Sequence, residues 1–195
     1  AVSSIYTEEW LKENWGEIKP TPVKNIQTLK DEQKISLGNK RNLQAIYGPG
    51  HAKHHYTFYD EYSGTLFMGD TLGLIYPHGD FVQPNLPPPD FSKEVLFETL
   101  DKLSNLELKY LALAHFGIHD KPYLLIENAK ESIEVWIKFV SNLPTLSNAE
   151  AAKVLSEWLV SNYKVLGIDD NTINNYINNS HFEMQIQGIR NYLTK

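Results

Sequence analysis

The periodicity of the apolar residues changes along the chain, and this change limits the folds that the 195 residues can adopt. Between residues 25 and 69, apolar and β-branched residues alternate with polar ones in short runs separated by turn residues. Alternation with a period of two predicts half-buried strands. From Ser92 onward, apolar residues recur mainly at helical spacing. The pattern therefore predicts an α/β fold in which a sheet is followed by helices.

The strand-forming part divides into several short segments. We predict three strands between Asn25 and Tyr47, in the runs NIQTL, QKISLG and LQAIYG. The next stretch, HHYTFYDEYSGTLFMGD, has two alternating runs around a polar turn with Gly64 and predicts a β-hairpin. Thr71–Asp90 is rich in Gly and Pro and predicts a long loop, which inside a domain is often functional. The run KYLALAHFG predicts a buried strand that ends at His115.

Helical spacing dominates the rest of the chain. The predicted helical segments are Glu8–Trp15, a helix capped by Ser92, a helix after Pro122, a helix over Asn148–Tyr163 and a weaker stretch over residues 170–195. We therefore divide the chain into a sheet-containing part, residues 1–121, and a helical C-terminal extension, residues 122–195.

Composition narrows the possible chemistry and the possible partners. The chain has no cysteine, so any metal ion must be held by His, Asp or Glu. Lys and Arg number 18 against 24 Asp and Glu, and no basic stripe appears, which disfavours nucleic acid as a partner. No run reaches the roughly 18 to 20 apolar residues that cross a bilayer, and the first residues do not form a signal peptide. We expect a cytoplasmic protein without membrane contact.

Three possible metal ligands follow predicted strands. They are His51 after LQAIY, Asp70 after GTLF and His115 after KYLAL. Side chains that leave the same edge of a sheet converge, and His with Asp suits zinc, manganese or Fe(II). Each residue alone has a simpler explanation, because a lone His after a strand is usually structural and a Gly-Asp pair usually forms a turn. The prediction of a metal site depends on the three together.

The order of these motifs resembles the second half of the metallo-β-lactamase fold. The resemblance covers Asn25–Gly117 and rests on Pro-Gly-His at residues 49–51, on FYDEYSGTLFMGDTLG and on His115 after an apolar strand. It implies an αββα sandwich of which residues 1–121 form the C-terminal part, with residues 122–195 as a helical appendage.

The resemblance also implies a dinuclear centre, most often with two zinc ions and in some branches with iron or manganese. His51 would bind one ion, His115 the other, and Asp70 would bridge both and act as the catalytic carboxylate. A water between two metal ions is acidified and attacks a carbonyl or phosphoryl centre. The implied activity is hydrolysis of a small-molecule ester, thioester, lactone or phosphoester.

Several further residues are candidates for supporting the ligands or lining a substrate pocket. These are His54, His55, Tyr76, His78 and His119. In the family, the position of His55 commonly holds a supporting histidine. His54 also fits a solvent-facing strand residue, and His119 also fits the start of a helix.

The chain departs from the family in one important respect. The superfamily signature His-x-His-x-Asp-His, which supplies most ligands of both metals, is absent from the sequence. Each metal position then keeps about two protein ligands, whereas catalytic zinc has at least three. We expect the chain alone to bind zinc weakly and to be inactive, and expect the missing half to be supplied by another polypeptide or by a second copy in a dimer.

Two alternatives to a hydrolase remain open at this point. The missing ligand loop favours a non-catalytic remnant of the fold that binds a partner. A mononuclear iron oxygenase or redox enzyme is also permitted, because His and Asp can hold Fe(II).

Apolar surface is a second reason to expect a missing half. We expect ten strand residues to point inward, more than the later helices can cover. They are Ile26, Leu29, Ile35, Leu37, Leu43, Ile46, Tyr56, Phe58, Leu66 and Met68.

Overall fold

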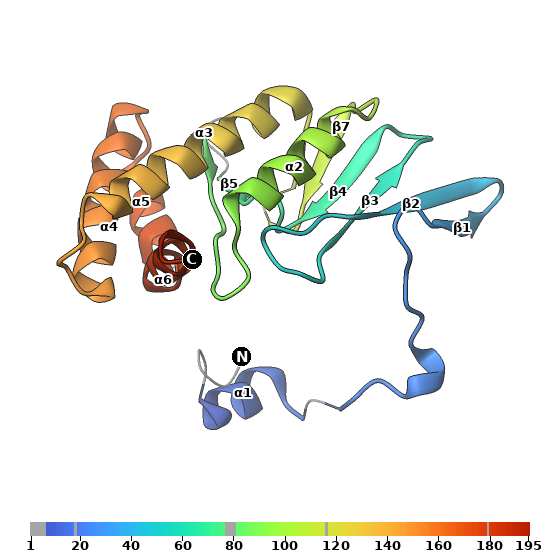
Figure 1. Ribbon diagram of the computed structural model, residues 1–195, viewed down its shortest axis with the longest axis horizontal. Coiled ribbons are helices and arrows are strands. Elements are labelled where there is room, and N and C mark those ends of the chain that lie inside the picture. The colour runs from blue at the N-terminus through green and yellow to red at the C-terminus, as the bar shows by residue number, and fades with distance from the viewer. Residues whose placement is uncertain (1–6, 18, 77–80, 116, 179) are drawn as a thin grey trace.

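A six-stranded sheet forms the framework of the computed structural model, which describes residues 7–17, 19–76, 81–115, 117–178 and 180–195. Helices α2 and α3 lie over one side of this sheet (Figure 1). In spatial order the strands are β1 (Lys34–Gly38), β2 (Arg41–Tyr47), β3 (Tyr56–Asp60), β4 (Thr65–Gly69), β7 (Tyr110–Leu113) and β8 (Ile118–His119). The mixed α/β class predicted from the sequence is confirmed.

The predicted hairpin is present as β3 and β4. Gly64 in its turn has φ +68°, a conformation that glycine adopts without strain. Strands β4 and β7 are parallel neighbours, and the chain crosses between them through α2 (Lys93–Ser104). Because parallel strands end at the same edge of a sheet, the residues after Gly69 and after Leu113 are brought together.

The first part of the predicted sheet is smaller than expected. Between Asn25 and Tyr47 the structure has two strands rather than three, because NIQTL forms no strand. It follows a short 3-10 helix, Val23–Asn25, and Ile26 in it is 57% exposed. Within the described residues β1 is the edge strand and pairs only with β2, so NIQTL is not paired with any strand. Alternation without a partner strand does not make a strand.

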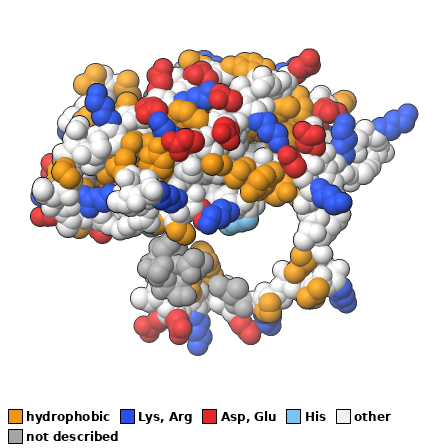
Figure 2. Space-filling view, in the orientation of Figure 1, with side chains coloured by type: hydrophobic (Ala, Val, Ile, Leu, Met, Phe, Trp, Pro, Cys, Tyr) orange, Lys and Arg blue, Asp and Glu red, His pale blue; other side chains and the backbone are white. Residues whose placement is uncertain are grey.

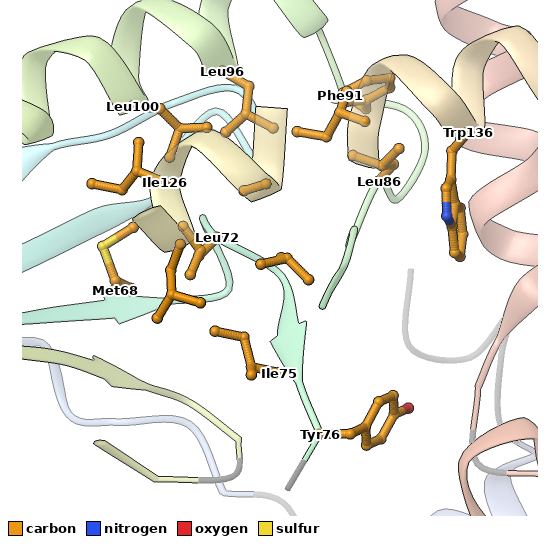
Figure 3. Packing of buried hydrophobic residues seen from close by; sticks show 14 of the residues in the cluster. Met68, Leu72, Ile75, Tyr76, Leu86, Phe91, Leu96, Leu100, Ile126 and Trp136 are labelled. Atoms are coloured by element: carbon orange, nitrogen blue, oxygen red, sulfur yellow. The ribbon is translucent and has the colours of Figure 1, made fainter. Parts of the chain in front are cut away.

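The described part of Thr71–Asp90, which leaves out residues 77–80, is more ordered than the predicted loop. It contains two short antiparallel strands, β5 (Leu74–Ile75) and β6 (Val82–Gln83). Four of its apolar side chains are almost fully buried: Leu72, Ile75, Val82 and Leu86. Figure 3 shows Leu72, Ile75 and Leu86 pointing into the core. The packing of these buried side chains holds the irregular backbone in place. Sequence periodicity does not reveal packing of this kind.

The helices agree with the prediction except at the C-terminus. The structure has α1 (Glu8–Trp15), α2, α3 (Pro122–Ser141) and α4 (Asn148–Val165). Ser92 is at the N-cap of α2, although its side chain makes no capping hydrogen bond. The last predicted stretch forms two helices, α5 (Asp170–Asn178) and α6 (Phe182–Leu193). Among the described residues, no helix is long and apolar enough to span a membrane.

A continuous apolar cluster joins the sheet to the C-terminal helices. Met68 from β4 contributes to it together with Leu96 and Leu100 from α2 and with Ile126 and Trp136 from α3 (Figure 3). Helix α3 also packs against β6 and α6. The helical extension therefore shares a core with the sheet, and the division at residue 121 stays a prediction.

The opposite side of the sheet is less covered. Phe67 is 43% exposed and Ile118 is 68% exposed, whereas Leu66 and Met68, which point to the helices, are fully buried. The face of Phe67 also carries Phe58, its cross-strand partner. On the other side, where α2 lies in front of the sheet in Figure 1, the same view in Figure 2 shows acidic and basic side chains interspersed.

The ten residues that we expected to point inward therefore do not share one face. Ile46, Leu66 and Met68 pack with the helices, while strand pairing puts residues such as Phe58 on the other side. Both faces of the sheet carry apolar side chains, so alternation along one strand does not identify a single inward set.

Candidate metal centre

The three predicted ligands follow strands that end at one edge of the sheet. Asp70 follows β4 directly, and His115 lies two residues beyond β7. His51 lies in the connection between β2 and β3. That connection passes close to α2 at Gly50, where a Cβ atom would approach the Leu96 backbone to 2.4 Å and where φ is +120°. Glycine at this position lets the loop that carries His51 pack directly on the helix.

The two histidines approach different oxygens of one carboxylate. His51 Nε2 lies 3.9 Å from Asp70 Oδ2, and His115 Nε2 lies 3.6 Å from Asp70 Oδ1. The His51 side chain is 11% exposed, whereas that of His115 is 55% exposed. The structure thus brings together the three residues that the sequence singled out, with Asp70 in the middle.

The ring of His51 is oriented by the backbone of the following loop. Its Nδ1 lies 2.9 Å from the carbonyl oxygen of Asn85, which can only accept a hydrogen bond. The proton of the neutral ring is therefore on Nδ1, and the lone pair of Nε2 is directed toward Asp70. A metal-binding histidine is commonly oriented in this way.

His55 supports Asp70 from the other side. The backbone N–H of Asp70 donates to His55 Nε2 at 3.2 Å, so the neutral ring carries its proton on Nδ1, 3.0 Å from Thr71 Oγ1. A Cβ atom at Gly69 would come within 2.5 Å of His55 Nε2, so glycine is required for this approach. Burial lowers the pKa of His55, and the neighbouring His51 lowers it further. The neutral ring fixes the backbone at Asp70.

The donor atoms of His51, Asp70 and His115 suit metal ions, but each metal position has only two of them. Asp70 Oδ1 is buried and has no hydrogen-bond partner in the described part of the chain, as expected for an oxygen that a cation would satisfy. The same residues contain no group of three or more His, Asp or Glu side chains that could hold one ion. Each position offers one imidazole and one carboxylate oxygen, fewer than the three protein ligands usual for catalytic zinc.

The other predicted site residues are placed differently. His54 is exposed. His119 is in β8, which runs antiparallel to β7, and it pairs with Leu111, two residues before the end of β7. His119 Nε2 is buried without a hydrogen-bond partner among the described residues. His78 lies outside the described residues.

A cavity of about 420 Å³ adjoins His115. Tyr76, predicted as a pocket residue, lines it. The remaining lining residues are Leu74, Gln83, Asn85, Asn175, Tyr176, Ser180, His181, Met184 and Gln185. The last six come from α5, α6 and the segment between them. Sequence analysis missed them, because the Asn-rich composition of this stretch gives no signal for a pocket.

The chain belongs to the metallo-β-lactamase superfamily, whose family model matches residues 2–115. Among solved structures, it is similar to a superfamily protein from Sulfolobus tokodaii (TM-score 0.59, 20% identity, 96% of this chain and 60% of the other). It is also similar to a metallo-β-lactamase family protein from Thermus thermophilus (TM-score 0.58, 20% identity, 85% and 48%). A β-lactamase domain protein from Burkholderia ambifaria gives a TM-score of 0.55 at 15% identity, with 86% and 46% covered.

These similarities show the fold of the chain and how much of each similar structure the chain covers. The chain spans between 46% and 60% of the length of the three solved structures. A comparison with curated protein sequences found no match. The metallo-β-lactamase fold predicted from the motifs is confirmed.

Proposed function

We propose that this chain contributes the bridging half of a dinuclear metal centre in a metal-dependent hydrolase. One observation carries the proposal: two imidazole Nε2 atoms approach separate oxygens of the Asp70 carboxylate, one at 3.9 Å and the other at 3.6 Å. A carboxylate that bridges two ions needs this arrangement. His51 and His115 would each hold one ion, most simply zinc, and iron or manganese would suit the same donors.

Two bound ions would supply a water acidified to hydroxide near neutral pH, together with a Lewis acid for the scissile group. The residues of the chain prepare that site. The Asn85 carbonyl keeps the Nε2 lone pair of His51 free of a proton, and His55 fixes the Asp70 backbone. The cavity beside His115 gives a small substrate a place next to the metal positions.

The remaining ligands would come from a segment with the His-x-His-x-Asp-His pattern, which this sequence does not contain. The partly exposed sheet face, with Phe67 and Ile118, offers apolar surface for the half-domain that carries such a segment. We propose that this half-domain is part of the same polypeptide or of a partner, because a second copy of this chain would lack the same segment.

The test compares hydrolysis by the protein that contains this chain together with the ligand segment, as wild type and as Asp70→Asn. We expect the substitution to reduce hydrolysis more than about a hundredfold, because changes even outside the coordination shell cost 10 to 100-fold. Asp120→Asn, which alters an exposed carboxyl group, is the matched control and should keep full activity. Equal activity of wild type and Asp70→Asn would exclude the proposed role of Asp70.

A non-catalytic module that binds a partner is the second candidate. It is favoured by the absence, among the described residues, of a three-ligand group. Under this alternative, zinc would not bind at His51 and His115 even when the second half-domain is present. Metal analysis of that assembled protein distinguishes the two candidates.

A further inference from the structure

We infer that the cavity beside His115 binds an uncharged, flat apolar group of the substrate. This inference rests on the proposed hydrolase function and narrows its substrate class. It follows from the charge, the walls and the hydrogen bonding of the cavity.

The charge of the lining is the first argument. Among the described lining residues there is no Lys, Arg, Asp or Glu, and the ionisable groups are two histidines and two tyrosines. Burial raises the pKa of Tyr76 and of Tyr176, so both phenols are neutral at physiological pH. Sites for phosphate and carboxylate normally supply Arg or Lys as a partner. A negatively charged group placed against these walls, away from the metal positions, would lose water without gaining a counter-charge from the protein.

The shape and nature of the walls are the second argument. Tyr76 stacks on Tyr176 with ring centroids 3.7 Å apart and planes at 20°. Tyr163 packs edge-on against Tyr176, with ring centroids 5.9 Å apart, and this contact limits the movement of the stacked pair. Met184 adds an adaptable apolar side chain. Stacked aromatic rings and a thioether that line the same cavity favour a planar or alkyl group of a ligand.

The polar groups in the cavity are largely engaged with one another. Tyr76 Oη lies 3.2 Å from Ser180 Oγ, which also accepts from Gln83 Nε2 at 3.2 Å. Gln185 Nε2 donates to Asn85 Oδ1 at 3.1 Å. These neutral dipoles can orient a carbonyl or ether oxygen, but they cannot neutralise a charge. A volume of about 420 Å³ is within the range of small-molecule sites, roughly 300 to 1,000 Å³.

The experiment measures ligand binding to the 195-residue chain in EDTA, so that metal ions and hydrolysis play no part. The probes are acetanilide, which is neutral, and phenyl phosphate, which has the same ring and a negative charge. Saturation-transfer NMR should detect acetanilide and little or no phenyl phosphate. Met184→Trp, which fills the cavity, should weaken acetanilide binding by about tenfold or more.

A charge substitution gives an independent arm of the test. Asn175→Lys puts a cation in the lining and should strengthen phenyl phosphate binding about tenfold relative to wild type. Asn174→Lys adds the same charge to a neighbouring exposed position of α5 outside the lining and should not do so. Circular dichroism spectra of the three variants establish that they are folded.

Two results would overturn the inference: phenyl phosphate binding to wild type as tightly as acetanilide, or Met184→Trp leaving acetanilide binding unchanged while the variant is folded. The proposed function fails separately. If the cavity binds acetanilide selectively but Asp70→Asn does not affect hydrolysis, the ligand preference stands and the metal-dependent role of Asp70 is wrong.

Discussion

The carboxylates of Asp60, at the end of β3, and of Asp70, directly after β4, differ in how their buried oxygens are satisfied. Asp60, with a fully buried side chain, accepts hydrogen bonds from Arg41, from the Ser63 hydroxyl and from the Tyr62 backbone N–H. Asp70 Oδ1, in contrast, has no hydrogen-bond partner in the described part of the chain. Hydrogen bonds to a buried carboxylate contribute to stability. A buried carboxylate oxygen without a hydrogen-bond partner is expected where a cation would bind. The contrast supports a structural role for Asp60 and a ligand role for Asp70.

This contrast predicts different effects of the two Asp→Asn changes on the metal-free chain. Asp60→Asn should lower the free energy of unfolding by about 2 kcal/mol at pH 7, the usual contribution of hydrogen bonds to a charged group. Asp70→Asn, the matched control, should change it by less than about 0.5 kcal/mol. Urea denaturation measures both. An equal loss for the two variants would contradict the assignment.

The stabilisation by Asp60 should also depend on pH. The Arg41 guanidinium, and next the Ser63 hydroxyl, lower the pKa of Asp60 below its ordinary value of 3.8. The unfolded chain therefore takes up the proton first as pH falls, so the stabilisation is complete above about pH 4 and is lost below it. The difference between wild type and Asp60→Asn should narrow in melts from pH 7 to pH 3. A constant difference would mean that ionised Asp60 is not its source.

At the scale of elements, α6 holds the loop that orients His51. Gln185 in α6 accepts from the Leu86 backbone N–H and donates to the Asn85 side chain, next to the carbonyl that binds His51 Nδ1. A Cβ atom at Gly188 would lie 1.8 Å from the Leu86 carbonyl oxygen, so helix and loop are in direct backbone contact. A helix more than 130 residues beyond His51 in the sequence thus supports the candidate metal centre.

Gly188→Ala should therefore destabilise the chain although alanine favours helices. We expect a loss of about 1 to 3 kcal/mol, as for overpacked interiors, because the helix must move away from the loop. Glu183→Ala, at an exposed position of the same helix, should be nearly neutral. Chemical denaturation of both variants makes the comparison. Unchanged stability of Gly188→Ala would show that α6 does not pack closely on this loop.

Sequence patterns predicted the elements that are determined by residues close together in the chain. The β3–β4 hairpin has its turn residue Gly64 within the alternating run, Asp70 follows β4 directly, and His115 lies two residues after β7. The cavity depends on contacts of Tyr76 with Ser180 and of Asn85 with Gln185, about 100 residues later in the chain. NIQTL fails as a strand for the same reason, because pairing depends on a neighbour that a run of residues does not reveal.

At the scale of the whole molecule, the two faces of the sheet are covered unequally. One face lies under α2 and α3, while the other leaves Phe67, Tyr110 and Ile118 between 42% and 68% exposed. Aromatic and branched side chains grouped on one surface favour association. We therefore expect this face to pack against another polypeptide, including a second copy of the chain.

Sedimentation velocity of the purified chain tests this expectation. At micromolar concentration the chain should sediment above its monomer mass of 22.4 kDa. Phe67→Glu should shift it toward the monomer, whereas Val165→Glu, at an apolar position that is 87% exposed at the end of α4, should not. A stable wild-type monomer with a cooperative thermal transition would mean that the chain needs no cover for this face.

The central claim, that His51, Asp70 and His115 form a metal centre, is tested most directly by titrating zinc into the chain and following the histidine ring nitrogens by NMR. We expect the Nε2 resonances of His51 and His115 to shift together, with weak affinity because each ion has about two protein ligands, and Asp70→Asn to abolish both shifts. His54, which is exposed, is the internal control. Saturating zinc without a response at His51 and His115, or the same response in Asp70→Asn, would contradict the account.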